Sequence, residues 1–310
     1  MEILKKTTPT LKERGLSQRD VLQKARQADN DEFYTRYEDV KKELEMYPKY
    51  VWQGRIVFCN CDDAVDDDEK NASAFALYFL RNFNKLGLKK LICTRYSGKV
   101  DIFNQGSKGY IFTKEGFDAE KDFPAGFSGS FDDPLSLKIL RGEADIVCTN
   151  PPFSKAIVFW DMLIKSGKQF LILSNIANPV TTAYIPYFKN NKVWAGFNSV
   201  NEYFNSKREL VSAAGHWYTN IPIKDRPKYK NLKIVPLNEI PAKYKKYDDS
   251  KMLVVDNGYI PKDYKKPFAV SARPILNGLL EKGYAIIHDK KYEPFINGKN
   301  CFARVIVQKI

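Results

Sequence analysis

Short apolar runs alternate with amphipathic stretches through the first two thirds of the chain. Four runs rich in β-branched and aromatic residues have the length of buried strands and span residues 55–59, 90–94, 145–149 and 169–173. Apolar side chains at helical spacing predict helices over residues 38–50 and 72–83, around residues 137–140, over residues 156–164 and before Asn190. This alternation predicts an α/β fold with a doubly wound sheet.

The pattern changes towards both ends of the chain. At the start, a charged arm precedes a helix that Ser17 and Asp20 would cap. A strand is predicted at residues 193–197, and from Ser199 onward the periodicity breaks down. Lysine, tyrosine and proline there separate strand-like pieces at residues 216–221, 232–235, 252–255 and 301–307. We therefore expect three parts, which are the arm and helix (1–30), the α/β core (31–198) and a smaller, irregular region (199–310) that returns strands to the core.

The third predicted strand runs into the polar turn Asn150-Pro151-Pro152-Phe153. Proline fixes its own φ, lacks a backbone N–H and holds the preceding residue extended, so neither strand nor helix can continue through the pair. Asn150 therefore lies at the carboxyl end of a buried strand. Ligands of open α/β sheets bind at that edge, so this rigid turn is well placed for chemistry.

The turn offers two fixed hydrogen-bond acceptors and an aromatic ring. The side-chain oxygen of Asn150 and the carbonyl of Pro151 can both accept from one amino group, while Phe153 offers a ring face to a planar substrate. An exocyclic base nitrogen is a poor nucleophile because its lone pair is delocalised, and two acceptors favour the pyramidal nitrogen of the transition state. The alternative is a strand that ends in a proline turn and packs one phenylalanine.

The 310 residues carry a net charge of +13, most of it in the last third of the chain. Residues 220–310 hold 19 basic and 9 acidic side chains, a net charge of +10. Lysine neutralises phosphate and tyrosine can stack, so lysines interleaved with tyrosines are candidate nucleic-acid contacts. Surface lysines that serve only solubility are the alternative. The candidates are Lys243, Lys245, Lys246, Lys265 and Lys266.

Composition disfavours several other classes of protein. No segment has the continuous apolar length of a membrane span, and residues 1–15 are charged rather than signal-like, so we expect a cytoplasmic protein. The five cysteines are odd in number and lie mostly in apolar runs, which indicates reduced thiols. Cys59 and Cys61 lack a second pair and the chain has two histidines, so no metal site is expected. A monomer is favoured.

The first predicted strand ends in Asn60-Cys61-Asp62-Asp63, where a nucleotide-binding fold would have a glycine-rich turn. Carboxylates repel phosphate, but they can bind an ammonium group or ribose hydroxyls. An acidic loop that is simply solvated is the alternative. Cys148 should point into the packing of its own strand, so we do not expect it to act as a covalent nucleophile.

Several separate blocks resemble the EcoRI-type adenine-specific DNA methyltransferases. The blocks are residues 31–37, 59–63, 86–91, 145–154 and 170–175, with weaker similarity at residues 217–220, 244–248, 260–261 and 296–299. The resemblance implies a Rossmann-like methyltransferase core that uses S-adenosyl-L-methionine. It makes Asn150, Pro151, Pro152 and Phe153 the catalytic motif. It also assigns cofactor binding to Tyr34, Thr35, Cys59, Asn60, Asp62, Asp63, Ser130 and Phe131.

One position departs from the family pattern. Family members carry an acidic residue just before the phenylalanine of the block after the second strand, whereas here Ser130 precedes Phe131. The usual hydrogen bond to the cofactor adenine would then be weaker, move to Asp132 or be absent. The order of the blocks further implies that residues 199–310 form the region that recognises the DNA target.

The leading hypothesis is methyl transfer from S-adenosyl-L-methionine to N6 of an adenine flipped out of double-stranded DNA, within a restriction-modification or related DNA-marking system. Asn150 and Pro151 would hold the amino group, with the base stacked on Phe153. Methylation of RNA adenine is one alternative. Methylation of a protein glutamine amide is a second, against which the basic tail argues. A DNA-binding protein with a degenerate methyltransferase core is the alternative from a different class.

Overall fold

The structure is a computed structural model that describes residues 33–62, 73–96, 109–117, 123–124, 126–205, 207–222, 232–240, 248, 252–255, 259–293, 295–300 and 302–310. Several positions singled out in the sequence lie outside these ranges. They are the predicted N-terminal helix, Asp63, Lys243, Lys245, Lys246 and Cys301.

Within the described ranges, nine strands form one mixed sheet in the order β1-β8-β9-β7-β6-β2-β3-β4-β5. The four central strands, β7, β6, β2 and β3, are parallel to one another, and the remaining pairs are antiparallel. These four are the strands that the apolar runs predicted. The sheet consists of β1 (Tyr34–Thr35), β2 (Ile56–Cys59), β3 (Lys90–Thr94), β4 (Gly109–Thr113), β5 (Gly116–Phe117), β6 (Ile146–Thr149), β7 (Gln169–Asn175), β8 (Trp194–Phe204) and β9 (Leu210–Thr219).

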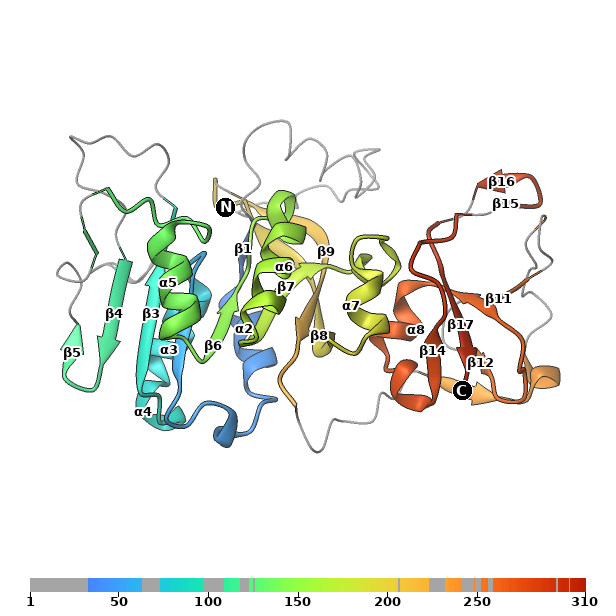
Figure 1. The fold of residues 1–310 in the computed structure, drawn as a ribbon, viewed down its shortest axis with the longest axis horizontal. Coiled ribbons are helices and arrows are strands. Elements are labelled where there is room, and N and C mark those ends of the chain that lie inside the picture. The colour runs from blue at the N-terminus through green and yellow to red at the C-terminus, as the bar shows by residue number, and fades with distance from the viewer. Residues whose placement is uncertain are drawn as a thin grey trace, which may run out of the picture.

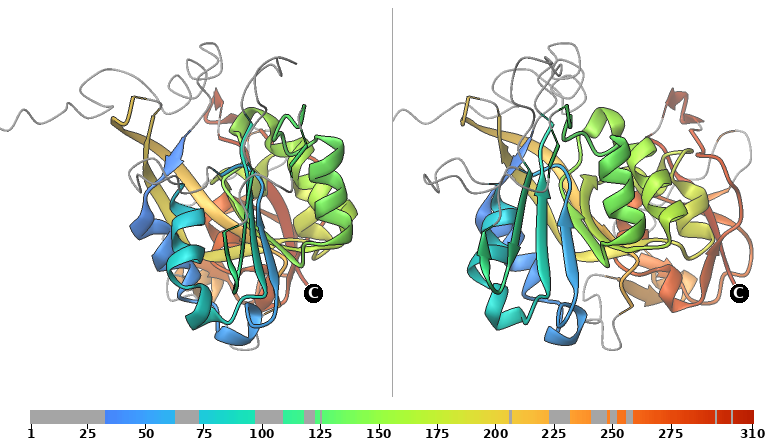
Figure 2. Two further views of the ribbon diagram at one scale, coloured as in Figure 1. Left: turned by 90° about the vertical axis from the view of Figure 1, so that its left-hand side faces the viewer. Right: turned by 60° about the vertical axis from the view of Figure 1, so that its left-hand side comes forward.

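Helices cover both faces of this sheet (Figures 1 and 2). One face carries α5 (Pro134–Gly142), α6 (Ala156–Ser166) and α7 (Ile185–Lys189). The opposite face carries α2 (Tyr37–Leu44), the 3-10 turn η1 (Lys49–Val51), α3 (Ala74–Arg81) and α4 (Phe83–Leu86). The α/β fold expected from the alternating pattern is therefore present, with a large mixed sheet.

Side chains of the central strands alternate between two hydrophobic clusters. On β6, Val147 belongs to the cluster shared with α5 and α6, whereas Ile146 and Cys148 belong to the cluster shared with α2, α3 and α4. Successive side chains of a strand point to opposite faces, so a strand covered on both faces is apolar at every position. This is why β6 is recognisable in the sequence, and the prediction that Cys148 is buried is confirmed.

Two helices end where glycine allows a left-handed backbone. Gly87 closes α4 with φ +70 and Gly167 closes α6 with φ +69, a conformation that side chains with a Cβ rarely adopt. The helix predicted over residues 72–83 is divided in the structure, because α3 ends at Arg81 and Asn82 separates it from α4.

A smaller sheet follows towards the C-terminus, in the order β11-β13-β17-β14. Phe268 of this sheet and Ile275 of α8 belong to the same hydrophobic cluster as Phe188 of α7, so the two sheets share one core. This part comprises β10 (Lys233–Val235), β11 (Leu253–Val255), β12 (Tyr259–Pro261), β13 (Phe268–Val270), α8 (Ala272–Leu276), β14 (Tyr284–Ile286), β15 (Phe295–Ile296), β16 (Lys299–Asn300) and β17 (Val305–Lys309). Short 3-10 turns are η3 (Phe153–Lys155), η4 (Asn178–Val180), η5 (Leu237–Glu239) and η6 (Leu280–Lys282).

Strand β8 differs most from the sequence-based expectation. It was predicted to stop at Phe197 but continues to Phe204, and its pairing with β9 shifts register between Ala195 and Ser199 and again after Val200. Such irregularities interrupt the alternation of buried and exposed side chains, so the strand pattern ends early in the sequence. Among the described residues, no helix has the length and apolar character needed to cross a membrane.

Candidate active site

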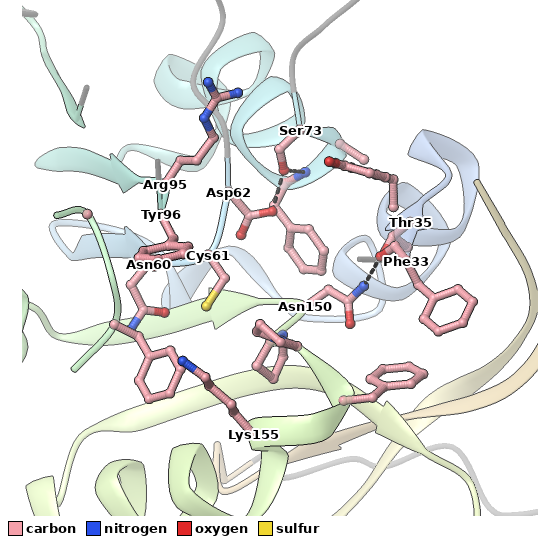
Figure 3. Close-up of a pocket in the computed structure, with 18 of the residues that line it drawn as sticks. Phe33, Thr35, Asn60, Cys61, Asp62, Ser73, Arg95, Tyr96, Asn150 and Lys155 are labelled. Carbon is pink, nitrogen blue, oxygen red and sulfur yellow. Dashed lines mark hydrogen bonds between the residues drawn. The ribbon is translucent and has the colours of Figure 1, made fainter. Parts of the chain in front are cut away.

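A pocket opens at the carboxyl ends of β2, β3 and β6. These strands are parallel neighbours, so the residues that follow them meet at one edge of the sheet. Asn60 and Asp62 follow β2, Arg95 follows β3 and Asn150 follows β6 (Figure 3). The space within the pocket is about 980 Å³, and this volume includes space that is open to solvent.

Asn150 is held in one orientation by the backbone of the N-terminal segment. Its Nδ2 donates a hydrogen bond to the carbonyl oxygen of Phe33 at 2.5 Å (Figure 3). The other atom of the amide, Oδ1, is buried and has no hydrogen-bond partner among the described residues. Since a buried acceptor without a partner is costly, Oδ1 is a candidate ligand contact.

Phe153 lies in the pocket wall and is packed by two other rings. Its centroid is 5.4 Å from that of Phe33 and 6.0 Å from that of Tyr203, and the Phe33 and Tyr203 centroids are 5.7 Å apart. Only 7% of Phe153 is exposed. The rings of Phe33 and Tyr203 therefore hold Phe153 in position.

Asp62 places a buried carboxylate in the pocket. Its Oδ1 accepts from the hydroxyl of Ser73, its Oδ2 accepts from the hydroxyl of Thr149 at 2.5 Å, and its backbone N–H donates to the carbonyl of Thr94. Ser73 also caps α3 by accepting from the backbone N–H of Phe75 at 3.2 Å. Residues from β3, β6 and the start of α3 thus hold this negative charge in place.

Other polar side chains beside Asp62 lack partners. Both polar side-chain atoms of Asn60 and the hydroxyl of Thr35 are buried without a hydrogen-bond partner in the described part of the chain. Buried polar groups are nearly always hydrogen-bonded in folded proteins, so these atoms are candidate contacts for a polar ligand. No group of histidine, cysteine and acidic side chains among the described residues could hold a metal ion.

Two cations lie against aromatic rings at the pocket. The Nζ of Lys155 is 5.9 Å from the ring centre of Tyr96 and 5.8 Å from that of Phe131. The guanidinium of Arg208 is 5.0 Å from the ring centre of Tyr34. Arg208 is exposed and belongs to the turn between β8 and β9, where its φ is +59.

The turn that carries Ser130 and Phe131 is fixed by Asp133. The Asp133 carboxylate caps α5 by accepting from the backbone of Leu135 at 2.9 Å, and it also accepts from the hydroxyl of Ser128 at 2.7 Å. Ser130 lines the pocket and donates its hydroxyl to the carboxylate of exposed Asp132. Phe131 is buried against the edge of Phe159.

The pocket brings together most residues proposed from the sequence. Its lining includes Tyr34, Thr35, Asn60, Asp62, Ser130, Phe131, Asn150, Pro151, Pro152 and Phe153. Cys59 is not part of the lining, because it faces the core opposite Cys93, and burial raises the pKa of its thiol well above the ordinary value. Lys265 and Lys266 are exposed and outside the lining, and the carbonyl of Lys265 accepts from Gln308 on the C-terminal strand β17.

Sequence reasoning missed other residues of the lining. Ser73 had a detectable signal, because a serine directly before an apolar helical pattern is a typical N-cap. Arg95 and Tyr96 directly follow the predicted strand at residues 90–94, and Lys155 follows the Asn-Pro-Pro-Phe turn, so their place at this edge of the sheet also had a signal. Arg208 had none, because it reaches the pocket only through the pairing of β8 with β9.

Comparisons with known proteins give matches over most of the chain. Residues 21–291 match a family model described as "Adenine-specific methyltransferase EcoRI". The Type II methyltransferase M.EcoRI of Escherichia coli is 30% identical, covering 93% of this chain and 96% of that protein. The Type II methyltransferase M.MgeORF184P of Mycoplasma genitalium is 31% identical, and the match covers 92% of this chain and 98% of that protein. The Type II methyltransferase M.MpnI of Mycoplasma pneumoniae is 35% identical, and the match covers 56% of this chain and 49% of that protein. No solved structure matches.

Proposed function

Because the chain belongs to the EcoRI family of adenine-specific methyltransferases, we propose that its pocket transfers a methyl group from S-adenosyl-L-methionine to N6 of adenine in double-stranded DNA. The family and its Type II relatives make the chain a DNA adenine methyltransferase of restriction-modification, and the resemblance seen in the motifs is confirmed. The observation that supports this pocket as the site is the buried, unpartnered Oδ1 of Asn150 at the end of β6.

The two larger parts of the chain would have separate tasks. We propose that the four parallel strands and their covering helices are a Rossmann-like core over residues 31–198, which holds cofactor and target base. Residues 199–310 would form the target-recognition region, with β9 returning to the large sheet. The lysines at positions 243, 245, 246, 265 and 266 would supply its attraction for DNA.

The unpartnered polar atoms of the pocket fit S-adenosyl-L-methionine. When bound, the cofactor supplies an electrophilic methyl group. The buried carboxylate of Asp62 would hold its ammonium group, and the side chains of Asn60 and Thr35 would supply the missing polar partners. Tyr34, Ser130 and Phe131, which also line the pocket, would contact the rest of the cofactor.

The chain itself would contribute two hydrogen-bond acceptors and one aromatic ring to catalysis. The Oδ1 of Asn150 and the carbonyl of Pro151 would accept hydrogen bonds from the adenine amino group. Those bonds localise the nitrogen lone pair, and they strengthen as the nitrogen becomes pyramidal, so they stabilise the transition state more than the ground state. Phe153, held by Phe33 and Tyr203, would position the flipped base.

The decisive test is methylation of mixed-sequence DNA by wild type and by Asn150→Ala, read by sequencing that reports modified adenines. We expect the variant to be at least about 100-fold slower, while its affinity for the cofactor changes by less than about twofold. Asn175→Ala, at the carboxyl end of β7 and outside the pocket, is the matched control and should stay active. Equal activity of Asn150→Ala and wild type would contradict the assignment.

The same assay separates the alternatives. RNA of the same sequence, offered in place of DNA, tests the RNA adenine alternative. A chain without affinity for S-adenosyl-L-methionine and its demethylated product would instead be a DNA-binding protein with a degenerate core.

A further inference from the structure

Residues 33–35 cross one side of the pocket and are named here the strap. Its carbonyl at Phe33 accepts the Nδ2 hydrogen of Asn150, although the two residues are 117 positions apart. The amide of Asn150 has one donor group, the NH₂ of Nδ2, and one acceptor atom, Oδ1. Nδ2 donates to the strap, whereas Oδ1 is buried without a hydrogen-bond partner among the described residues, at a residue that lines the pocket.

The strap is anchored on several sides. Tyr34 and Thr35 form β1 and pair with Phe204 and Tyr203 of β8. The Phe33 ring packs against Phe153 and Tyr203, with centroids 5.4 and 5.7 Å away. Directly after the strap, Arg36 forms an ion pair with Glu202 of β8 at 2.6 Å. These contacts hold the Phe33 carbonyl in a fixed position, as a preorganised site requires.

We propose that the backbone carbonyl of Phe33 is the positioning group that sets the amide orientation of Asn150. This inference rests on the proposed function, in which Oδ1 accepts from the adenine amino group. If the amide were reversed, its Nδ2 would face the adenine donor and Oδ1 would face the Phe33 carbonyl. Both contacts would then be repulsive, so the strap selects the orientation that can act in catalysis.

The variant Asn150→Asp tests whether the Phe33 carbonyl needs a donor at position 150. In Asn150→Asp the ionised side chain has two acceptors and no donor, so one oxygen would face the Phe33 carbonyl. Protonation restores the original pattern, because the acidic hydroxyl can donate to Phe33 while the other oxygen accepts from adenine. The variant should therefore be active only in its protonated form.

Other ionisable side chains face the same pocket. They come from β1 (Tyr34), the end of β2 (Cys61 and Asp62), the end of β3 (Arg95 and Tyr96), the turn after β6 (Lys155) and the β8–β9 turn (Arg208). Tyr203 of β8 and Cys148 of β6 are buried behind the pocket wall. All of them are present in both wild type and variant, so the ratio of the two rates isolates the group at position 150.

The experiment measures single-turnover methylation with saturating cofactor and DNA, from about pH 5.5 to about pH 8.5. We expect the rate of Asn150→Asp relative to wild type to rise as pH falls, by up to about tenfold for each pH unit over which the carboxyl stays mostly ionised. Asn175→Asp is the matched control. There the side-chain oxygen accepts from the backbone of Ala177 at 2.8 Å, so an aspartate keeps the bond and its rate ratio should be flat.

A rate ratio for Asn150→Asp that does not change with pH would overturn the proposal. If the variant does not fold, a measurement on the wild type decides. With Asn labelled in ¹⁵N and Phe labelled at the carbonyl ¹³C, a through-hydrogen-bond NMR coupling from the Asn150 side chain to a Phe carbonyl is expected. Its absence would also overturn the proposal. Failure of wild type to methylate adenine would instead count against the proposed function, whatever the NMR result.

Discussion

At the scale of single residues, Asp62 shows how the pocket fixes a negative charge. Two hydroxyl groups, from Ser73 and Thr149, donate to its two oxygens, and only 5% of the residue is exposed. A carboxylate held in this way keeps its position when a ligand binds. An ammonium group beside it would gain about 4 kcal/mol of attraction at 4 Å in the effective dielectric of a protein surface, before desolvation is subtracted.

Asp62→Asn removes this charge with little change in shape. We expect S-adenosylhomocysteine, which carries the ammonium group, to bind at least about tenfold more weakly. A tenfold loss of affinity corresponds to about 1.4 kcal/mol, which is about a third of the attraction between the two charges. Methylthioadenosine lacks the amino-acid part and should bind wild type and variant equally. Calorimetric titration of both ligands checks this. An equal loss for both ligands would mean that Asp62 acts on the nucleoside or on the fold.

Residue roles could be predicted where they follow directly from position in a strand. Asn150 and Asp62 each come just after an apolar run, so their place at the sheet edge was predictable. The contact of the Phe33 carbonyl with Asn150 was not, because it joins segments 117 residues apart and involves a backbone atom. Arg208 was also beyond local reasoning, because it comes to the pocket only when β8 and β9 pair.

At the scale of elements, Glu43 links α2 to the irregular part of β8. Its carboxylate is fully buried and accepts from the backbone N–H groups of Phe197 and Asn198, both at 2.9 Å, and from the hydroxyl of Tyr47. A Cβ at Gly196 would come within 2.3 Å of the Glu43 carboxylate, so glycine is needed for this close approach. The irregularity that ended the strand pattern early in the sequence is thus the place where β8 receives this side chain.

Glu43 makes stability depend on pH in a defined direction. Burial, opposed by these hydrogen bonds, raises the pKa of Glu43 from 4.5 to about 7. Between these values the folded chain binds the proton more readily than the unfolded chain, so stability falls as pH rises and levels off above about pH 7. Relative to Glu43→Gln, wild type should lose roughly 2 to 3 kcal/mol of unfolding free energy from about pH 5 to about pH 8.

Urea unfolding of both proteins across this pH range measures that difference. Glu45→Gln is the matched control, because Glu45 is exposed at the end of the same helix and its removal should leave the pH profile unchanged. A difference between wild type and Glu43→Gln that is constant with pH would show that Glu43 has the same charge in the folded and unfolded states.

The β8–β9 turn brings a cation to the pocket entrance. Arg208 is exposed, lines the pocket and lies over the Tyr34 ring, a position suited to a phosphate of the flipped nucleotide. We expect Arg208→Ala to weaken DNA binding by about 5- to 10-fold, the loss of one such contact, with cofactor affinity unchanged. Fluorescence anisotropy with labelled DNA checks this. Lys207→Ala, the exposed neighbour outside the lining, should have a smaller effect, and equal effects would contradict a specific role for Arg208.

At the scale of the whole molecule, the large sheet was predictable and the small one was not. The central parallel strands are apolar throughout because helices cover both their faces. In the small sheet, β17 comes last in the chain but pairs between β13 and β14. That order depends on non-local pairing of strands three to five residues long, which local patterns do not encode.

The distribution of charge leads to a prediction for association with DNA. Strand β1, whose Tyr34 and Thr35 line the pocket, lies towards the upper end of the molecule in Figures 1 and 2, whereas the C-terminus lies at the lower end. The segment of Lys265 runs beside the last residues of the chain, since Lys309 and Gln308 donate to the carbonyls of Lys262 and Lys265. We therefore expect Lys265 and Lys266 to attract DNA from a distance, as part of the electrostatic field that the net charge of +13 produces.

Replacing Lys265 and Lys266 with glutamate changes the net charge by four units without altering the pocket. We expect the association rate at low salt to fall several-fold, to about one third or less of wild type, and the difference to vanish as salt screens the field. The dissociation rate should stay within about twofold of wild type, because long-range attraction acts on the encounter rather than on the bound complex. Stopped-flow measurements with labelled DNA at several salt concentrations give both rates. A faster dissociation that persists at high salt would instead place these lysines in direct contact with DNA, which would extend the interface from the pocket entrance to the opposite end of the molecule.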